Sequence, residues 1–358
     1  MAKKICILAL ITILFSLGSP WIDPATASLP NGNRLKDPYA ILRNSLPIEQ
    51  KELRELQNKL EDTSEDLRGG RWSAISKATS RSQFLVSNRK NEILESMPEE
   101  NKEKAVNLLA KLKQDLDELG QIANEKNKVS FFEVRRQSLK NIDDLESLLI
   151  TNKFPYEIPS EYDNLPRLLG RANVEIKTSK GNMSAIIDGY NAPLTAGAFI
   201  DLSLKGFYDG LPINRAEEFF ILQTGDPKGE EIGYVNPENN ELRKVPLEIR
   251  TPNSEDTLYG QTFEEVGLYT ETPILPFATL GTLGWAHSDS DLNDGSSQFF
   301  FFLYEAELNP AGRNLIDGRN AAFGYVIEGS EILNKLGVDD KIIEIKVLNG
   351  SENLKLKA

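Results

Sequence analysis

The segment GFYDGLPINRAEEFFILQTGDP, residues 206–227, decides the fold of the C-terminal half of this 358-residue chain. Its residue types predict a strand, a bend and a second strand. One arginine, Arg215, stands among apolar neighbours, and Asn214 precedes it. The segment therefore raises a question of function. Arg215 either carries chemistry or pairs with a surface carboxylate such as Glu217 or Glu218.

The rest of the C-terminal half continues the β pattern. NVEIKTSKGNMSAIIDGY, residues 173–190, alternates around a Gly-Asn turn and predicts a hairpin. PLTAGAFIDLSLKGF, residues 193–207, predicts a short amphipathic helix, and many short strands and glycine-rich turns follow. We therefore expect residues 170–358 to form a mainly β domain, a closed barrel with a few helices.

Residues 37–150 have the spacing of amphipathic helices. In residues 101–126 the apolar residues recur at helical spacing, and residues 130–150 repeat the pattern. Two weaker helical segments are expected at 48–67 and 71–96. Four helices with short turns predict an antiparallel bundle. A linker over 151–169, with Pro155, Pro159 and Pro166, separates this bundle from the β domain.

The first 27 residues have the pattern of a secretory signal peptide. Lys3 and Lys4 precede an apolar run, and a small-x-small site ends at Ala27. An uncleaved anchor is the alternative, although the apolar run is short for a spanning helix. Cleavage leaves 28–150 as the bundle domain and predicts an exported protein.

Composition excludes several classes of function. The net charge of −13 argues against nucleic acid and anionic membrane surfaces as partners. Cys6, the single cysteine, lies in the expected signal peptide, and a lone histidine, His287, excludes a multi-histidine zinc site. DSDLNDG, residues 289–295, lacks the glycine and glutamate of a calcium loop at their required positions. We expect no metal and no cofactor.

Three ordered motifs resemble the cyclophilins. They are APLTAGAFIDLSLKGFYDGLPINRAEEFFILQTGDPKG, then DGSSQFFFFL, then LIDGRNAAFGYVIEG. The resemblance implies a multidomain α + β chain whose C-terminal domain is a closed eight-stranded β-barrel with capping helices. It also implies catalysis of cis/trans isomerisation at X–Pro bonds without a cofactor.

The resemblance assigns site residues by motif position. Arg215 matches the catalytic arginine, and a fixed guanidinium suits the donor that stabilises a twisted prolyl amide. The residues that the resemblance places in the substrate groove are Phe220, Ile221, Gln223, Ala286, His287, Gln298, Phe300, Leu315 and Asn320. Gln223 matches the glutamine that positions the arginine, and Phe299 is expected inside the barrel.

The departures from the family pattern concern the rim of the groove. Asn214 replaces a histidine beside the arginine, and Asn320 replaces a second histidine. Leu315 replaces the tryptophan that closes one side of the site and binds cyclosporin. RAEEFF replaces an R-V-x-P-G-F bend, so that Glu217 and Glu218 bring negative charge beside Arg215. We expect peptide binding with weak isomerase activity.

The whole architecture resembles the long thylakoid-lumen cyclophilins, in their cyanobacterial form. That resemblance implies a location in the thylakoid lumen or periplasm, without stable membrane insertion after signal cleavage. It implies proline-containing clients, including lumenal segments of photosystem II, whose folding or assembly the protein would aid. The alternative is a non-catalytic, peptide-binding assembly factor or chaperone with a degenerate groove. In either case we expect the bundle or the linker to pack near Arg215 and to limit client access.

Overall fold

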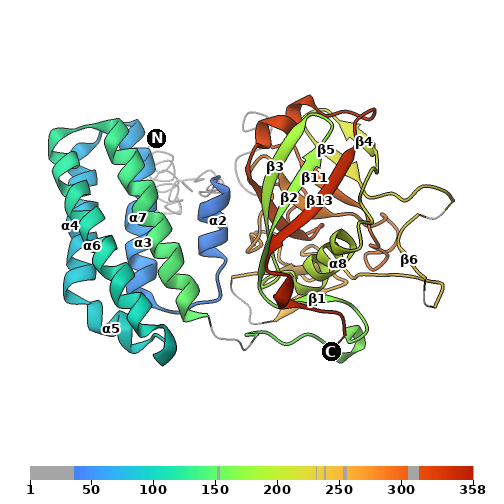
Figure 1. The fold of residues 1–358 in the computed structure, drawn as a ribbon, viewed down its shortest axis with the longest axis horizontal. Helices are drawn as coiled ribbons and strands as arrows, with labels where there is room; N and C mark the ends of the chain where they lie inside the picture. The colour runs from blue at the N-terminus through green and yellow to red at the C-terminus, as the bar shows by residue number, and fades with distance from the viewer. Residues whose placement is uncertain are drawn as a thin grey trace, which may run out of the picture.

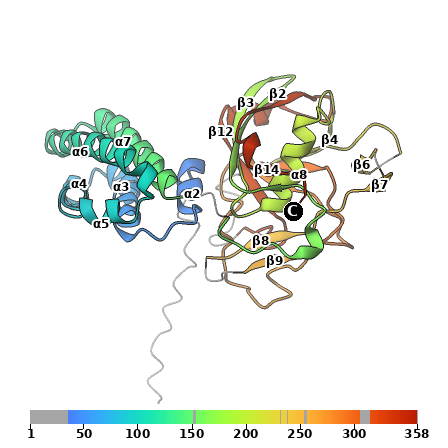
Figure 2. The same ribbon diagram turned by 60° about the horizontal axis from the view of Figure 1, so that its bottom comes forward.

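The computed structural model describes residues 36–150, 154–230, 232–237, 239–252, 256–304 and 314–357. A helical bundle and a β-barrel lie side by side, and the short helix α2 (Pro38–Asn44) lies between them (Figures 1 and 2). The expected signal peptide falls outside the described residues. Within the described part, no helix has both the length and the apolar character needed to cross a bilayer.

The bundle consists of α3 (Lys51–Arg68), α4 (Trp72–Asn88), α5 (Lys90–Glu95), α6 (Lys102–Glu125) and α7 (Lys128–Leu149). The stripe predicted on α6 is buried, including Leu109, Leu112, Leu116 and Leu119. The segment expected as one helix over 71–96 divides at Arg89 into α4 and α5. Pro98 precedes a 3₁₀ turn (Glu99–Asn101), which leads into α6.

The barrel is built on an eight-stranded antiparallel sheet in the order β13-β2-β3-β12-β10-β11-β5-β4. Its strands are β2 (Arg171–Thr178), β3 (Gly181–Asp188), β4 (Ile213–Glu217), β5 (Ile221–Thr224), β10 (Thr282–Trp285), β11 (Phe299–Phe302), β12 (Ala322–Glu328) and β13 (Ile342–Asn349). The two outer strands meet through a short bridge, where Gly210 N–H donates to the Ile342 carbonyl at 2.8 Å. The sheet thus curls into the predicted barrel.

Helix α8 (Pro193–Leu204) caps the barrel, because the Phe199 ring packs 5.1 Å from both Phe299 and Phe323. Three two-stranded pairs lie outside the main sheet. They are β1 (Arg167–Leu168) with β14 (Leu354–Lys355), β6 (Val235–Asn236) with β7 (Glu241–Leu242), and β8 (Glu248–Arg250) with β9 (Thr257–Tyr259). Short 3₁₀ turns cover Ser160–Tyr162, Ser330–Lys335 and Ser351–Asn353.

Helix α2, which the sequence pattern did not predict, joins the bundle to the barrel. Ile41 and Leu42 belong to the hydrophobic core of the barrel rather than to the core of the bundle. On the barrel side, Arg171 donates to the Leu42 carbonyl and pairs with Asp188 at 2.8 Å. On the bundle side, Arg54 of α3 donates to the Leu46 carbonyl at 2.6 Å. These contacts fix the bundle beside β2 and β3, and α2 also contacts β12.

The expectation that the bundle packs near Arg215 is wrong. Strand β4, which carries Arg215, lies on the side of the barrel away from the bundle in both views (Figures 1 and 2). The reason is that the α2 contacts are made by Arg171 on β2 and Asp188 on β3, and neither of these strands pairs with β4.

Candidate active site

The register of the sheet aligns three of the expected site residues. Arg215 on β4 pairs with Gln223 on β5, which pairs with Phe300 on β11. Directly opposed residues of antiparallel strands point to the same face, so these three side chains form one row. The row ends at Gly284 on β10, where an added Cβ would lie 2.2 Å from the Phe300 ring. Gly284 therefore makes room for Phe300, a role that the sequence analysis missed, although a glycine inside a strand signals such an approach.

Asn214 faces the same site because β4 contains a bulge. The pairing with β5 shifts between Ile213 and Arg215, so one extra residue is accommodated on β4. Asn214 Nδ2 lies 3.4 Å from Gln298 Oε1, which accepts a shorter bond of 2.7 Å from Gln223 Nε2. Strict alternation along the strand would have pointed Asn214 away from Arg215. The bulge therefore explains why Asn214 and Arg215 face the same site.

Gln298 is the centre of the hydrogen-bond network at the polar end of the site. Its Nε2 donates to Asp226 Oδ1 and to the Ile232 carbonyl, both at 3.0 Å. Its backbone carbonyl accepts from the Ala286 N–H at 3.1 Å. These bonds fix the amide of Gln298 and, through it, the orientation of Gln223.

Arg215 itself is paired with Glu217. The two residues lie two positions apart on β4, on one face of the strand. Glu217 Oε1 accepts from Arg215 Nε at 2.7 Å and lies 2.5 Å from Nη2. The side chains are 50% and 46% exposed, and exposed pairs of this kind contribute ~0–1 kcal/mol. The guanidinium is therefore available for exchange with another acceptor.

The apolar end of the site is formed around Phe220. The Phe220 ring is 37% exposed and meets the buried Phe302 ring edge-on at 6.3 Å. Ile221 is buried opposite Phe302, and Phe300 stacks on Phe277 at 5.8 Å. Phe299 points to the opposite face and packs inside the barrel against Phe199 of α8. Phe220 is thus the accessible aromatic beside the row.

The bend before Phe220 contains a residue in an unusual conformation. Phe219 has φ of 60°, in the left-handed region that glycine adopts without strain. The cyclophilin pattern has glycine at this position. The Phe219 side chain is exposed, so the substitution costs backbone strain without adding a buried contact.

The other expected rim residues form a second group. His287 Nε2 lies 3.3 Å from Asn320 Nδ2 and 3.0 Å from the Arg319 carbonyl. His287 is joined to the first group through its neighbour Ala286. Leu315 is 75% exposed, so its side chain is largely uncovered by the described residues. The loop 289–295 forms an acidic turn in which Asp294 accepts from the Ser288 N–H at 2.8 Å.

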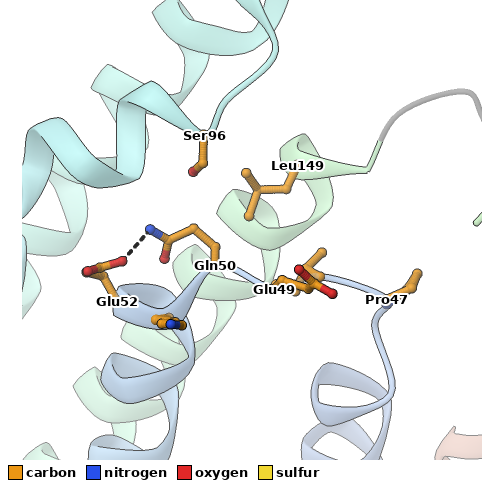
Figure 3. A pocket seen from close by; sticks show the side chains of 8 residues that line it. Pro47, Glu49, Gln50, Glu52, Ser96 and Leu149 are labelled. Carbon is orange, nitrogen blue, oxygen red and sulfur yellow. Dashed lines mark hydrogen bonds between the residues drawn. The ribbon is translucent and has the colours of Figure 1, made fainter. Parts of the chain in front are cut away.

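A pocket of about 460 Å³ lies far from this row, at the end of the bundle (Figure 3). It is lined by Pro47, Ile48, Glu49, Gln50, Lys51, Glu52, Ser96 and Leu149. Gln50 turns toward Glu52 and donates to it at 2.7 Å. None of these residues is an expected site residue.

Two family models match the chain. Residues 37–150 match the model described as "Peptidyl-prolyl cis-trans isomerase CYP38-like, PsbQ-like domain". Residues 173–347 match the model described as "Cyclophilin type peptidyl-prolyl cis-trans isomerase/CLD". The two matches correspond to the helical and the β part of the structure, with α2 included in the first.

Relatives of similar length match most of the chain. A thylakoid lumen peptidyl-prolyl cis-trans isomerase of Synechocystis sp. is 44% identical over 91% of this chain and 86% of its own. The chloroplastic peptidyl-prolyl cis-trans isomerase CYP38 of Arabidopsis thaliana is 36% identical over 93% of this chain and 78% of its own. The chloroplastic isomerase CYP37 of the same plant is 30% identical over 96% and 76%. The similarity thus extends across both domains.

Proposed function

The chain belongs to the cyclophilin-type peptidyl-prolyl cis-trans isomerases, in the group with a CYP38-like N-terminal domain, and we propose that Arg215 is its catalytic residue. It is an isomerase-type protein of the thylakoid lumen. The observation that carries the role of Arg215 is the row Arg215–Gln223–Phe300, in which a cation, an amide and an aromatic ring face the same side of three adjacent strands.

This row has the parts that the reaction requires. Rotation about an X–Pro bond must overcome a barrier of about 18–20 kcal/mol, because amide resonance is lost at the transition state. In the proposed mechanism the proline ring lies against Phe220 and Phe300, and a guanidinium N–H of Arg215 donates to the prolyl nitrogen as it becomes pyramidal. That bond is stronger in the transition state than in the planar amide, and it therefore accelerates rotation.

A second candidate function is peptide binding without catalysis, as an assembly factor. The observation in its favour is the pairing of Arg215 with Glu217, which engages the Nε and Nη2 donors of the guanidinium. In either case the clients are proline-containing polypeptides. We further propose that they include lumenal segments of photosystem II proteins, which rests on the resemblance of the whole architecture.

The test is a prolyl isomerase assay on residues 28–358. We expect the cis-to-trans relaxation of Ala-Pro peptides to accelerate in proportion to protein concentration. Binding of the same peptides without acceleration, measured by fluorescence titration, would instead establish the binding module. Neither binding nor acceleration would overturn both functions.

The exposure of Leu315 leads to a prediction on drug binding. An exposed leucine lacks the indole N–H and the broad ring through which the family's tryptophan holds cyclosporin. We expect the natural chain to bind cyclosporin weakly, and Leu315→Trp to bind it about tenfold more tightly, a gain of about 1.4 kcal/mol. Isothermal titration measures both constants. Tight binding by the natural chain would show that LIDGRN does not occupy the assumed position.

A further inference from the structure

The pairing of Arg215 with Glu217 has a geometry that favours exchange. Arg215 Nε and Nη2 both approach one oxygen of Glu217, Oε1. Among the described contacts, the second carboxylate oxygen is left to solvent. Both side chains are about half exposed, and β4 is the last strand of the sheet order. A second cation can therefore reach Glu217 from solvent without displacing any buried group.

The polar end of the groove carries an excess of negative charge. Glu218 follows Glu217 and is exposed, and Asp226 is tied to the groove through Gln298. Within residues 214–230, Arg215 and the exposed Lys228 are the cations, against four carboxylates, because Glu230 is exposed as well. Charges arranged in this way attract a basic segment and repel an acidic one.

We propose that Glu217 is a specificity-determining residue that selects clients with a lysine or arginine beside the proline. The inference rests on the proposed catalytic role of Arg215. In the free protein Glu217 holds the guanidinium away from the prolyl nitrogen. A basic client side chain takes the place of Arg215 on Glu217, and Arg215 is released toward the bound prolyl amide.

The exchange links charge recognition to catalysis. A neutral client must separate Arg215 from Glu217 without compensation, whereas a basic client forms a new pair as the old one is lost. The basic client therefore gains most in the transition state, where Arg215 has left Glu217 and donates to the prolyl nitrogen. Interactions of that kind raise kcat/KM for the preferred client.

The test compares matched peptides in the full chain. The peptides carry Lys, Gln or Glu immediately before or immediately after the isomerising Ala-Pro pair. For the natural chain we expect the better-placed Lys peptide to be isomerised with about fivefold higher kcat/KM than its Gln counterpart, which corresponds to about 1 kcal/mol. In Glu217→Gln, the Gln peptide should rise to the rate of the Lys peptide, and the preference should vanish.

A matched control is Glu55→Gln, which removes another exposed partner of an arginine, Arg81, in the bundle. The control should keep the Lys preference, and added salt should reduce that preference in the natural chain, because salt screens exposed charges. Catalysis with the same Lys-to-Gln ratio in Glu217→Gln would overturn the inference and leave the proposed function intact. Absence of catalysis in every variant would overturn the proposed function and this inference with it.

Discussion

Replacing Arg215 with alanine is expected to lower kcat/KM for X–Pro isomerisation by about 10²–10³-fold, the usual cost of losing one preorganised transition-state donor. Folding should be unaffected. The side chain is half exposed, and its partner Glu217 is exposed as well, so its removal leaves no buried group without a partner. The assay is the relaxation of an Ala-Pro peptide, with thermal unfolding measured on the same samples.

Two further variants show whether the loss of isomerase activity in Arg215→Ala comes from the loss of the transition-state donor. Arg215→Lys keeps the charge but lacks the planar set of donors, and should recover only part of the activity. Arg81→Ala removes an exposed arginine that is paired with Glu55 in the bundle, and should retain full activity. Activity of Arg215→Ala equal to that of the natural chain would refute the mechanism and favour the binding module.

The parts of the fold that were predictable depend on local pattern. The helical spacing of Leu109, Leu112 and Leu116 identified the bundle core, because burial of one face repeats along a single helix. The short helix α2 could not be found in this way. It has seven residues, and its burial is set by the distant partners Arg171 and Asp188. No periodicity within so short a segment reports such contacts.

In the candidate site, too, some features follow from local sequence and others depend on contacts between elements. The positions of Arg215, Gln223 and Phe300 followed from a linear motif, and the structure places them in one row. The orientation of Asn214 depends on a bulge, and the space for Phe300 depends on Gly284 across the sheet. Both features depend on how neighbouring strands pair, β4 with β5 and β10 with β11, and a linear motif does not specify that register. Their assignment as functional residues remains a prediction that the Arg215 experiment addresses.

The junction between the bundle and α2 leads to a prediction on pH. Glu146 of α7 is fully buried, and its Oε2 has no hydrogen-bond partner among the described residues. Burial raises the pKa of Glu146 to about 8. The positive charges of Arg54 and Arg43 lower this pKa by less, and the negative charges of Asp143 and Glu61 raise it further. At neutral pH the carboxyl group is therefore mostly protonated in the folded protein.

The raised pKa of Glu146 makes the folded protein more stable at acidic pH than at alkaline pH. In the unfolded chain the pKa of Glu146 returns to about 4.5, so the folded state binds the proton more tightly. The stabilisation is complete below pH 4.5 and is lost as the pH rises through 8. Over that window it amounts to a few kcal/mol, at about 1.4 kcal/mol per unit of pKa difference. We expect the bundle to melt ~5–10 °C higher at pH 5.5 than at pH 8.

Glu146→Gln provides the decisive comparison, because glutamine keeps the shape of the side chain and cannot ionise. Arg54 still has the carbonyls of Arg43 and Leu46 and the Gln57 side chain as acceptors. Its guanidinium therefore keeps hydrogen-bond partners when Glu146 is replaced by the neutral glutamine. The variant should melt at a higher temperature than the natural chain at pH 8 and at the same temperature at pH 5.5.

Glu248 in the barrel, whose burial raises its pKa to about 7, gives both proteins the same smaller pH dependence of stability. Circular dichroism, which follows the helices, separates the two, and Glu55→Gln on the surface of α3 serves as the control. An equal pH dependence in Glu146→Gln and the natural chain would show that Glu146 is not the titrating group at this junction.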